Sequence, residues 1–521
     1  MMVIRSNQTA AALGLTLLLA LLLGAPPNRR ASAAPEDVQR DLVDVAGADE
    51  PHTPPALNRA IAFRYHVPRA ARPSAALVLI PGLNSGPNSL DLISRALVTA
   101  YGPSLEVWAV ALRSTQLQDR KGVEEALAYG NPDFALAYYY GKLPIDGQTF
   151  HLVQGPEVPY MAYWGVDVHL RDFRALVREI HARYPGLPVV LGGHSLGGIM
   201  AAAYAGYNFA ELSGPDQASN QAAPDEVGGR EISGLLFLDG MPLWIPFRLS
   251  PNQYLHGITV PILGRIPGVD NLTDADPRQR VWPFTRTSKI ARTKDSILLD
   301  VLSVYAYLRP ETASIFPFPP RSGVPITNEA LVAALFSDQM EPDLLVRAGV
   351  EIPIGIFDRI PDPANINHRG LLDLQSGRPV RGERLIRLPP PQERGGARVP
   401  IRSLVSAILR PGGDFTLWYF PWRLILDFAL ATNLDTSDTF ARQYIHLTQV
   451  RDTAVPILAI GAGHGIIRSA GMTGFYRDHI ATPPGSVTVK IFSDYYHLDV
   501  EDADPNPAVP LIVDWLKRVL H

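Results

Sequence analysis

The sequence predicts an α/β protein in which helices cover both faces of a doubly wound, mostly parallel sheet. Short, continuously apolar segments recur along the chain and alternate with segments of helical period. Strands of a parallel sheet are buried on both faces and therefore have this apolar pattern. One such run, at 189–191, leads directly into a glycine-rich turn and a helix-favouring segment. The 521 residues suffice for one large domain with a sizeable insertion.

The other predicted elements follow in order along the chain. Residues 34–57 are rich in proline, aspartate and alanine, so we expect a loose lead-in there. An alternating segment at 61–67 predicts an early strand. Apolar runs then predict buried strands, and helical spacing predicts two amphipathic helices. The strands are 75–80, 105–112, 189–191, 233–238, 455–461 and 487–492, and the helices are 167–180 and 509–520. A long, aromatic-rich connection follows the strand at 105–112.

The turn after the strand at 189–191 has the sequence GHSLG at 193–197, which fits the pattern G-x-S-x-G. Glycine is needed two residues either side of the serine when strand and helix backbones approach closely. Such a turn lifts the Ser195 hydroxyl out of the sheet and puts the Leu196 N–H at a helix N-terminus, where it can stabilise an oxyanion. His194 is expected to pack or to form a hydrogen bond. The alternative is an ordinary glycine-rich turn that carries a serine.

This strand–turn–helix arrangement resembles the α/β-hydrolase superfamily, and the resemblance covers about residues 60–240 and 455–521. It implies that the loop after the strand at 75–80 donates a second oxyanion N–H. Pro81-Gly82-Leu83 occupies that position, so Leu83 is the candidate donor. The loop lacks the His-Gly-Gly form of many lipases, and a plain strand-end turn is the alternative.

A serine nucleophile needs a histidine base, which a carboxylate orients. In the superfamily the chain order is serine, acid, histidine, with the histidine in the loop after the last strand. His497 has this place beyond the strand at 487–492. His464 follows the preceding strand, where many relatives carry the acid, and His479 comes before the last strand. The resemblance therefore implies His497 as the base.

The triad acid departs from the commonest pattern of the superfamily. The loop at 461–467 has no Asp or Glu at the usual place. Some members carry the acid at the end of the preceding strand, and Asp239 stands at that point here. Asp239 is therefore the predicted acid, with a turn-forming Asp-Gly as the alternative. Asp494 and Asp499 are further candidates, although they are so close to His497 in sequence that they would reach its Nδ1 poorly.

The chain divides into four predicted parts: a signal peptide at 1–33, a first core part at 34–240, an inserted cap at 241–453 and a second core part at 454–521. The insertion is too long for a β–α connection, and the superfamily commonly inserts a cap at this point. It includes helical stretches, a proline-rich basic loop and an aromatic run, at 296–307, 328–336, 378–398 and 415–422. An apolar, aromatic cap implies a lipophilic substrate and fits transient contact with a membrane or lipid surface. Alternatively, the aromatic residues form the cap's own core.

The N-terminus has the pattern of a secretory signal peptide. Arg5 precedes an apolar stretch at 10–23, and Ala-Ser-Ala at 31–33 fits a cleavage site. We therefore expect a secreted or periplasmic protein of a bacterium, and an uncleaved membrane anchor is the alternative.

Composition excludes several other functions. The net charge is −4 and no basic run is present, so no nucleic-acid partner is expected. The chain has no cysteine, which excludes disulfides, thiolate metal sites and a cysteine nucleophile. No H-E-x-x-H, EF-hand, Walker or dinucleotide motif occurs, so neither a metal nor a cofactor is expected. The oligomeric state is left open by the sequence.

Together these features predict a secreted serine esterase, similar to lipases, that acts on esters with a lipophilic acyl or alcohol part. Ser195, His497 and Asp239 would form its triad, and Leu83 and Leu196 its oxyanion hole. A serine at the turn argues against relatives of the dehalogenase or epoxide-hydrolase type, which need a carboxylate there. Two alternatives stay open: an amidase or thioesterase with the same triad, and an inactive binding protein of the same fold.

Overall fold

The computed structural model describes residues 38–68, 72–210, 226–260, 264–272, 293–315, 326–337, 348, 358–361, 371–372, 379–380, 384–387, 398–434 and 436–520. The predicted signal peptide at 1–33 lies outside these residues, as does most of the loop at 378–398.

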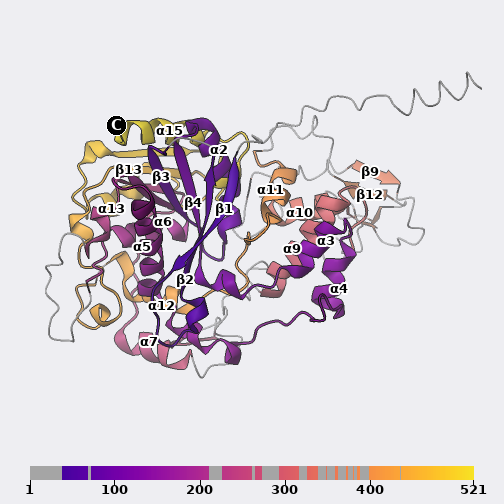
Figure 1. Ribbon diagram of the computed structural model, residues 1–521, viewed down its shortest axis with the longest axis horizontal. Helices are drawn as coiled ribbons and strands as arrows, with labels where there is room; N and C mark the ends of the chain where they lie inside the picture. Colours follow the sequence, from indigo (N-terminus) through magenta and orange to yellow (C-terminus); the bar gives the residue numbers. More distant parts are fainter. Residues whose placement is uncertain are drawn as a thin grey trace, which may run out of the picture. The chain divides into compact units, whose positions relative to one another are not determined.

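An eight-stranded sheet, in the order β1-β2-β4-β3-β5-β6-β13-β14, forms the centre of the described chain (Figure 1). The strands β4 to β14 pair in parallel, whereas β2 is antiparallel to both β1 and β4. The predicted α/β class with a mostly parallel sheet is therefore confirmed. The strands are β1 Gln39–Ala46, β2 Arg59–His66, β3 Ala75–Ile80, β4 Leu105–Ala111, β5 Val189–His194, β6 Gly234–Leu238, β13 Ile457–Ala462 and β14 Val487–Phe492.

The first strand corrects the expectation of a loose lead-in at 34–57. Strand β1 pairs along its whole length with β2 and lies at the edge of the sheet. Val43 is its one fully buried residue. Because an edge strand buries few side chains and carries charged ones, it lacks the apolar run that identifies a central strand.

Helices cover both faces of the sheet, and β3 shows why its sequence is continuously apolar. Val78 and Ile80 pack into the core beneath α5 Val166–Arg183 and α6 Leu196–Ala205. Leu77 and Leu79 point the other way, into the core beneath α2 Asp91–Tyr101 and α15 Ala508–Val519. Successive side chains of a strand alternate between faces, so a strand covered on both sides needs apolar residues throughout.

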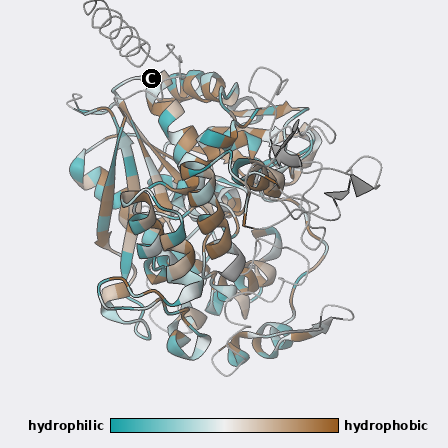
Figure 2. Cartoon of the chain, turned by 90° about the vertical axis from the view of Figure 1, so that its right-hand side faces the viewer, coloured by the Kyte–Doolittle hydropathy of each residue, from teal (hydrophilic) through white to brown (hydrophobic). Residues whose placement is uncertain are grey.

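A further group of helices has a hydrophobic core of its own, which we call the second core. It joins α3 and α4, from the connection after β4, to α9, α10 and α11 from the predicted insertion (Figure 1). Trp164 and Trp418 are buried in it. Helices in the structure carry both apolar and hydrophilic residues (Figure 2), as helices that pack on one side do. The bounds are α3 Lys121–Ala128, α4 Asp133–Gly141, α9 Thr293–Leu308, α10 Asn328–Phe336 and α11 Ile401–Ile408.

The aromatic run at 415–422 lies inside the protein. Its aromatic and leucine side chains are at most 3% exposed and divide between the second core and the core under α5 and α6. This favours the alternative that these aromatic residues form a core. The helix α12 Trp422–Leu430 also packs against α5. The predicted cap boundaries at 241–453 stay a prediction.

The remaining elements are short: α7 Pro251–His256, α13 Gly474–Arg477, α14 Asp499–Asp502, β7 Ile258–Val260, β8 Gly264–Ile266, β9 Asp358–Pro361, β10 Leu371–Leu372, β11 Pro379–Val380 and β12 Arg384–Arg387. Within the described ranges, no helix combines the length and apolarity needed to cross a bilayer.

Candidate active site

Ser195 occupies the tip of the turn between β5 and α6 and is 6% exposed. Its φ of 53° and ψ of −121° are unusual for a residue with a side chain. The flanking glycines are required by close backbone contacts. A Cβ on Gly193 would overlap Gly197, and a Cβ on Gly197 would overlap the carbonyl oxygen of Ile80. The sharp strand-to-helix turn that the motif predicts is therefore present.

The end of β6 lies directly against this turn. The Ser195 amide donates a hydrogen bond to the carbonyl oxygen of Leu238, at 3.0 Å. A Cβ on Gly240 would overlap the Ser195 backbone, so only glycine fits there without a shift. Asp239, between these two contacts, has a positive φ of 42°. The turn at Ser195 and the Asp-Gly at the end of β6 therefore pack as one unit.

The two candidate oxyanion donors lie on either side of Ser195. Leu196 is the first residue of α6, and Leu83 is in the turn after β3. A Cβ on Gly82 would be 3.1 Å from the Cβ of Ser195, so this loop passes close to the serine. Neither the Leu83 nor the Leu196 amide donates a hydrogen bond to another described residue. Both amides are thus free to bind a substrate oxygen.

The structure brings His497 and Asp239 together. Nδ1 of His497 is 2.6 Å from Oδ2 of Asp239, and both side chains are buried. The carboxylate also accepts three backbone hydrogen bonds: its Oδ1 from Ala462 at 3.0 Å and Ile467 at 2.8 Å, and its Oδ2 from Ile466 at 2.8 Å. Four hydrogen bonds to one carboxylate fix its position beside the His497 ring.

The end of β13 and the loop after it, where many relatives carry the acid, hold the Asp239 carboxylate instead. The loop wraps around Asp239 and supplies backbone N–H groups to it. A Cβ on Gly465 would overlap the Asp239 carboxylate, so the glycine allows this approach. Asp239 follows the end of β6, and its backbone N–H donors come from the end of the neighbouring strand β13 and from the loop after it.

Ser195 and His497 are not joined by a hydrogen bond. Within the described part of the chain, Ser195 Oγ has no hydrogen-bond partner. They are linked instead through His194, which precedes the serine and donates from Nε2 to the His497 carbonyl oxygen at 3.0 Å. Catalytic hydrogen bonds are often loose in a free enzyme and tighten only when substrate binds.

The competing candidates have other contacts. Asp499 accepts a hydrogen bond from the Tyr496 amide and pairs with Arg398, each at 2.8 Å. Asp494 lies 3.6 Å from the same arginine. His464 stacks on the Tyr496 ring, and Nδ1 of His479 bonds to a backbone oxygen.

His194 and Glu501 are buried next to each other beside the site, and the sequence analysis does not predict this pairing. The ring of His194 lies 4.4 Å from that of His497, between centroids, and its Nδ1 is 3.3 Å from Oε2 of Glu501. The sequence analysis expects packing or a hydrogen bond for His194 and does not single out Glu501. A run of acidic residues after His497 is its only sequence signal, and this run looks like a solvated helix end.

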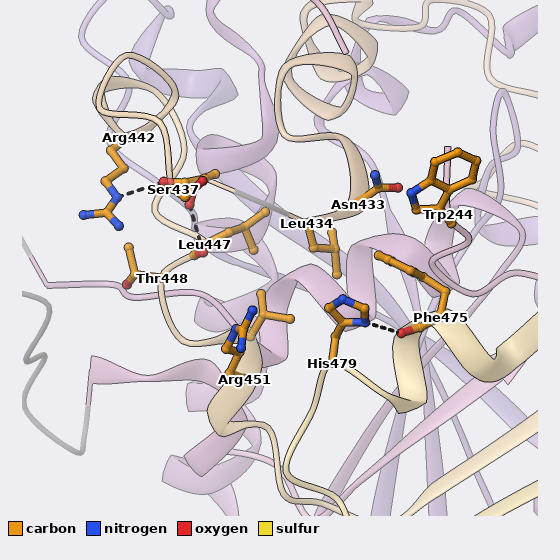
Figure 3. Close-up of a pocket in the computed structure, with 12 residues that line it drawn as sticks. Trp244, Asn433, Leu434, Ser437, Arg442, Leu447, Thr448, Arg451, Phe475 and His479 are labelled. Carbon is orange, nitrogen blue, oxygen red and sulfur yellow. Dashed lines mark hydrogen bonds between the residues drawn. The ribbon is translucent and has the colours of Figure 1, made fainter. Parts of the chain in front are cut away.

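A separate hollow of about 610 Å³ lies near the ends of α12 and α13. Figure 3 shows Trp244, Phe475 and His479 on one side of it and Arg442 and Arg451 on the other. None of the five predicted site residues lines this hollow. The described residues contain no group of three or more His, Asp or Glu side chains arranged to hold a metal ion.

The strand order and the turn at Ser195 define the α/β-hydrolase fold. No protein-family model and no curated protein matches the chain. Among solved structures, the chain is similar to a "putative lipase" from Sulfolobus solfataricus, with 14% identity and a TM-score of 0.47 over 92% of this chain and 95% of that one.

Two other solved structures are similar at the same level. One is an epoxide hydrolase from Vigna radiata, with 12% identity and a TM-score of 0.37 over 93% of this chain and 99% of that one. The other is a haloalkane dehalogenase variant from Bradyrhizobium elkanii, with 10% identity and a TM-score of 0.37 over 92% and 97%. With values this low, function has to be argued from the residues of the site.

Proposed function

We propose that this chain is a serine hydrolase that cleaves carboxylic esters with Ser195 as nucleophile, His497 as base and Asp239 as the residue that orients His497. The observation that carries the proposal is the 2.6 Å hydrogen bond between Asp239 Oδ2 and His497 Nδ1. A carboxylate in that position keeps Nδ1 protonated and leaves Nε2 to accept a proton.

In the proposed reaction, Nε2 of His497 takes the proton of Ser195 Oγ as the oxygen attacks the ester carbonyl carbon. The carbonyl oxygen becomes an oxyanion, which the N–H groups of Leu83 and Leu196 stabilise. When the tetrahedral intermediate collapses, the C–O bond to the alcohol breaks and His497 returns the proton to the alcohol. Water then attacks the acyl-enzyme with His497 again as base, which releases the acid and restores Ser195.

The two free amides support this assignment. Donors aimed at the place where charge develops contribute strongly to acyl transfer, and removing one typically costs on the order of 10²–10³ in kcat. An amide that is already bonded within the protein would be a poor donor, and neither candidate is bonded among the described residues.

The same triad would serve amide or thioester hydrolysis, and an inactive protein of this fold would bind ligand only. The backbone of Ser195 favours the enzyme, because a strained serine turn costs stability on the order of 1–3 kcal/mol, and a protein that only binds has no use for it. Comparing kcat/KM on an ester, an amide and a thioester with one acyl group separates the three activities.

The direct test is hydrolysis of p-nitrophenyl esters of increasing chain length, together with labelling by a fluorophosphonate. We expect Ser195→Ala to abolish labelling and to lower kcat at least about 10³-fold. The matched control is Ser406→Ala, which removes a hydroxyl from α11 that bonds to the Arg402 carbonyl. Absence of both labelling and hydrolysis in the parent protein would contradict an enzyme and favour the binding protein.

Exposed apolar side chains support contact with a lipid surface. Trp244, Ile245 and Phe247 are 63%, 50% and 50% exposed, and they follow the end of β6 within a few residues of Asp239. Tryptophan and phenylalanine with neighbouring aliphatic residues suit the interface between water and acyl chains. A substrate presented at such an interface would reach the enzyme on the side of the segment 244–247.

This contact is tested by sedimentation with phosphatidylcholine vesicles. Trp244→Ala is expected to weaken partitioning about tenfold, because a fully inserted large side chain contributes roughly 1.5–3 kcal/mol. Tyr129→Ala removes a 68% exposed aromatic residue next to α3 and serves as the control. Equal losses in both variants would mean that segment 244–247 has no special role.

A further inference from the structure

His194 touches each part of the candidate site. It precedes Ser195, its ring packs on the His497 ring, and its Nε2 bonds to the His497 carbonyl oxygen. A Cβ on Gly82, in the loop that carries Leu83, would be 3.2 Å from its Nδ1. The orientation of this one ring therefore affects the serine turn, the base and the oxyanion loop together.

The contacts fix where the hydrogens of this ring lie. A carbonyl oxygen only accepts hydrogen bonds, so Nε2 of His194 must be the donor in the 3.0 Å contact with His497. If the ring is neutral, its Nδ1 then has a lone pair and needs a donor. The atom facing it is Oε2 of Glu501, at 3.3 Å.

Glu501 can supply that donor only as a neutral carboxylic acid. It is completely buried, and neither of its oxygens has a hydrogen-bond partner in the described part of the chain. Burial, with a smaller effect of Asp502, raises the pKa of Glu501 well above its ordinary value. Burial, and next the His497 ring, lower the pKa of His194 well below its ordinary value. Both shifts favour a neutral acid beside a neutral ring.

We infer that Glu501 is a positioning residue: its carboxylic O–H donates to Nδ1 of His194 and holds that ring so that Nε2–H fixes the backbone of His497. The effect on catalysis is indirect, since Glu501 acts through His194 on His497, and it rests on the proposed serine-hydrolase function.

The charges around the pair are consistent with a neutral Glu501. Asp502, its neighbour in α14, is also buried, and burial followed by Asp499 and Asp91 raises the pKa of Asp502 well above its ordinary value. Asp499 is paired with Arg398, and Asp91 of α2 with Arg95 and Arg410. These three arginines are therefore paired with Asp499 and Asp91 and form no ion pair with Glu501 among the described residues.

The test compares two substitutions of nearly equal size. Glu501→Gln keeps a donor for Nδ1, so kcat on the best ester should stay within about twofold of the parent. Glu501→Leu removes the donor, and kcat should fall roughly tenfold with KM changed less than twofold, because a buried acceptor is left unsatisfied. Asp502→Asn is the control, since Asp502 is equally buried but has no hydrogen bond or ion pair with His194 in the described part of the chain; kcat should not change.

Equal kcat in the parent and a folded Glu501→Leu variant would overturn the inference, and so would a Glu501→Gln variant as slow as Glu501→Leu. A second measurement needs neither activity nor folded variants. Nitrogen-15 NMR of the histidine rings in the parent protein should show His194 as the neutral Nε2–H form from pH 5 to 8. A His194 ring protonated on both nitrogens at pH 7 would instead mean an ion pair with ionised Glu501.

These measurements separate the inference from the proposed function. If the parent has no esterase activity, the serine-hydrolase proposal fails, while the NMR spectrum still decides which form of His194 is present. If Ser195→Ala is inactive and Glu501→Leu is fully active, the function stands and the positioning role fails.

Discussion

Asp239 and Glu501 are both completely buried carboxyl groups, each facing the Nδ1 atom of a histidine at the same site. Asp239 accepts four hydrogen bonds, three of them from backbone amides. Glu501 accepts none among the described residues. Asp239 is thus surrounded by hydrogen-bond donors, whereas Glu501 faces the Nδ1 atom of His194.

The difference shows that the surroundings decide what a buried carboxyl group does. The four donors hold the Asp239 carboxylate in one position against Nδ1 of His497, which suits the role of orienting the base. Without donors, the neutral form is favoured and the group becomes a donor itself. In the proposed arrangement, the two acidic side chains hold two neighbouring imidazoles in opposite tautomers, with the proton on Nδ1 of His497 and on Nε2 of His194.

The largest expected effect comes from removing the charge of Asp239. Asp239→Asn should lower kcat about 10⁴-fold, because the amide favours the wrong tautomer of His497. Circular dichroism should confirm that the variant is folded, since asparagine still offers an oxygen to the backbone donors. If Asp239→Asn lowered kcat as little as Glu501→Gln does, the two carboxyl groups would not differ in their contribution to catalysis.

A smaller loss is expected when the donors around Asp239 are displaced. Gly465→Ala places a Cβ against the Asp239 carboxylate, so the loop must move and its amides lose contact. We expect kcat to fall roughly 10- to 100-fold, with a lower Tm. Gly471→Ala, where a Cβ meets only the distant hydroxyl of Ser469, should change neither and is the matched control.

The stability of the fold should reveal the neutral state of Glu501. With its pKa raised in the folded protein, Glu501 stays protonated there while it ionises in the unfolded chain above about pH 4.3. The unfolded state then binds fewer protons, so stability falls as pH rises towards the folded pKa, by at most about 1.4 kcal/mol per pH unit.

The Glu501→Gln variant has no ionisable group at position 501, so its stability should not fall in this way as pH rises. Its Tm relative to the parent is therefore expected to rise steadily from pH 4 to pH 8 in thermal scans. Glu124→Gln, at an exposed position of α3, is the control for the substitution of Glu by Gln itself. A constant difference for Glu501→Gln would indicate that Glu501 is ionised in the folded protein.

The smallest effect on activity is expected at Asp499, which is buried but paired with Arg398 rather than with a histidine. Asp499→Asn still accepts from the Tyr496 amide, so kcat should change less than threefold while stability falls by about 1 kcal/mol. Steady-state kinetics and denaturant unfolding test this. A loss near that of Asp239→Asn would make Asp499 the acid that serves His497.

The sheet could be predicted from the sequence where strands are buried on both faces. The run that forms β3 has no polar residue, so its sequence alone predicts a strand that is buried on both faces. Strand β1 could not be found, because its burial is one-sided and charged residues alternate through it. Helix α4 was also missed: it is apolar and aromatic around most of its circumference, so no helical period stands out.

The candidate site could be predicted from the sequence where its chemistry depends on a particular type of side chain. Ser195 follows from its glycines, whereas the partnership of Asp239 with His497 was implied by the resemblance to the α/β-hydrolase superfamily. Three of the donors to Asp239 are backbone amides. Since almost every residue has a backbone amide, the residue types in the sequence do not indicate which ones bind Asp239. Glu501 was missed because acidic residues in a short run usually face water, and only the tertiary structure shows that this one is buried.

The second core has a consequence for recombining this protein with others. Its helices come from two stretches that are far apart in the chain, α3 and α4 before the Ser195 turn and α9 to α11 long after it. A chimera that exchanged residues 241–453 for another protein's segment would leave α3, α4 and Trp164 without the partners they pack against. The two stretches are therefore better exchanged together than singly.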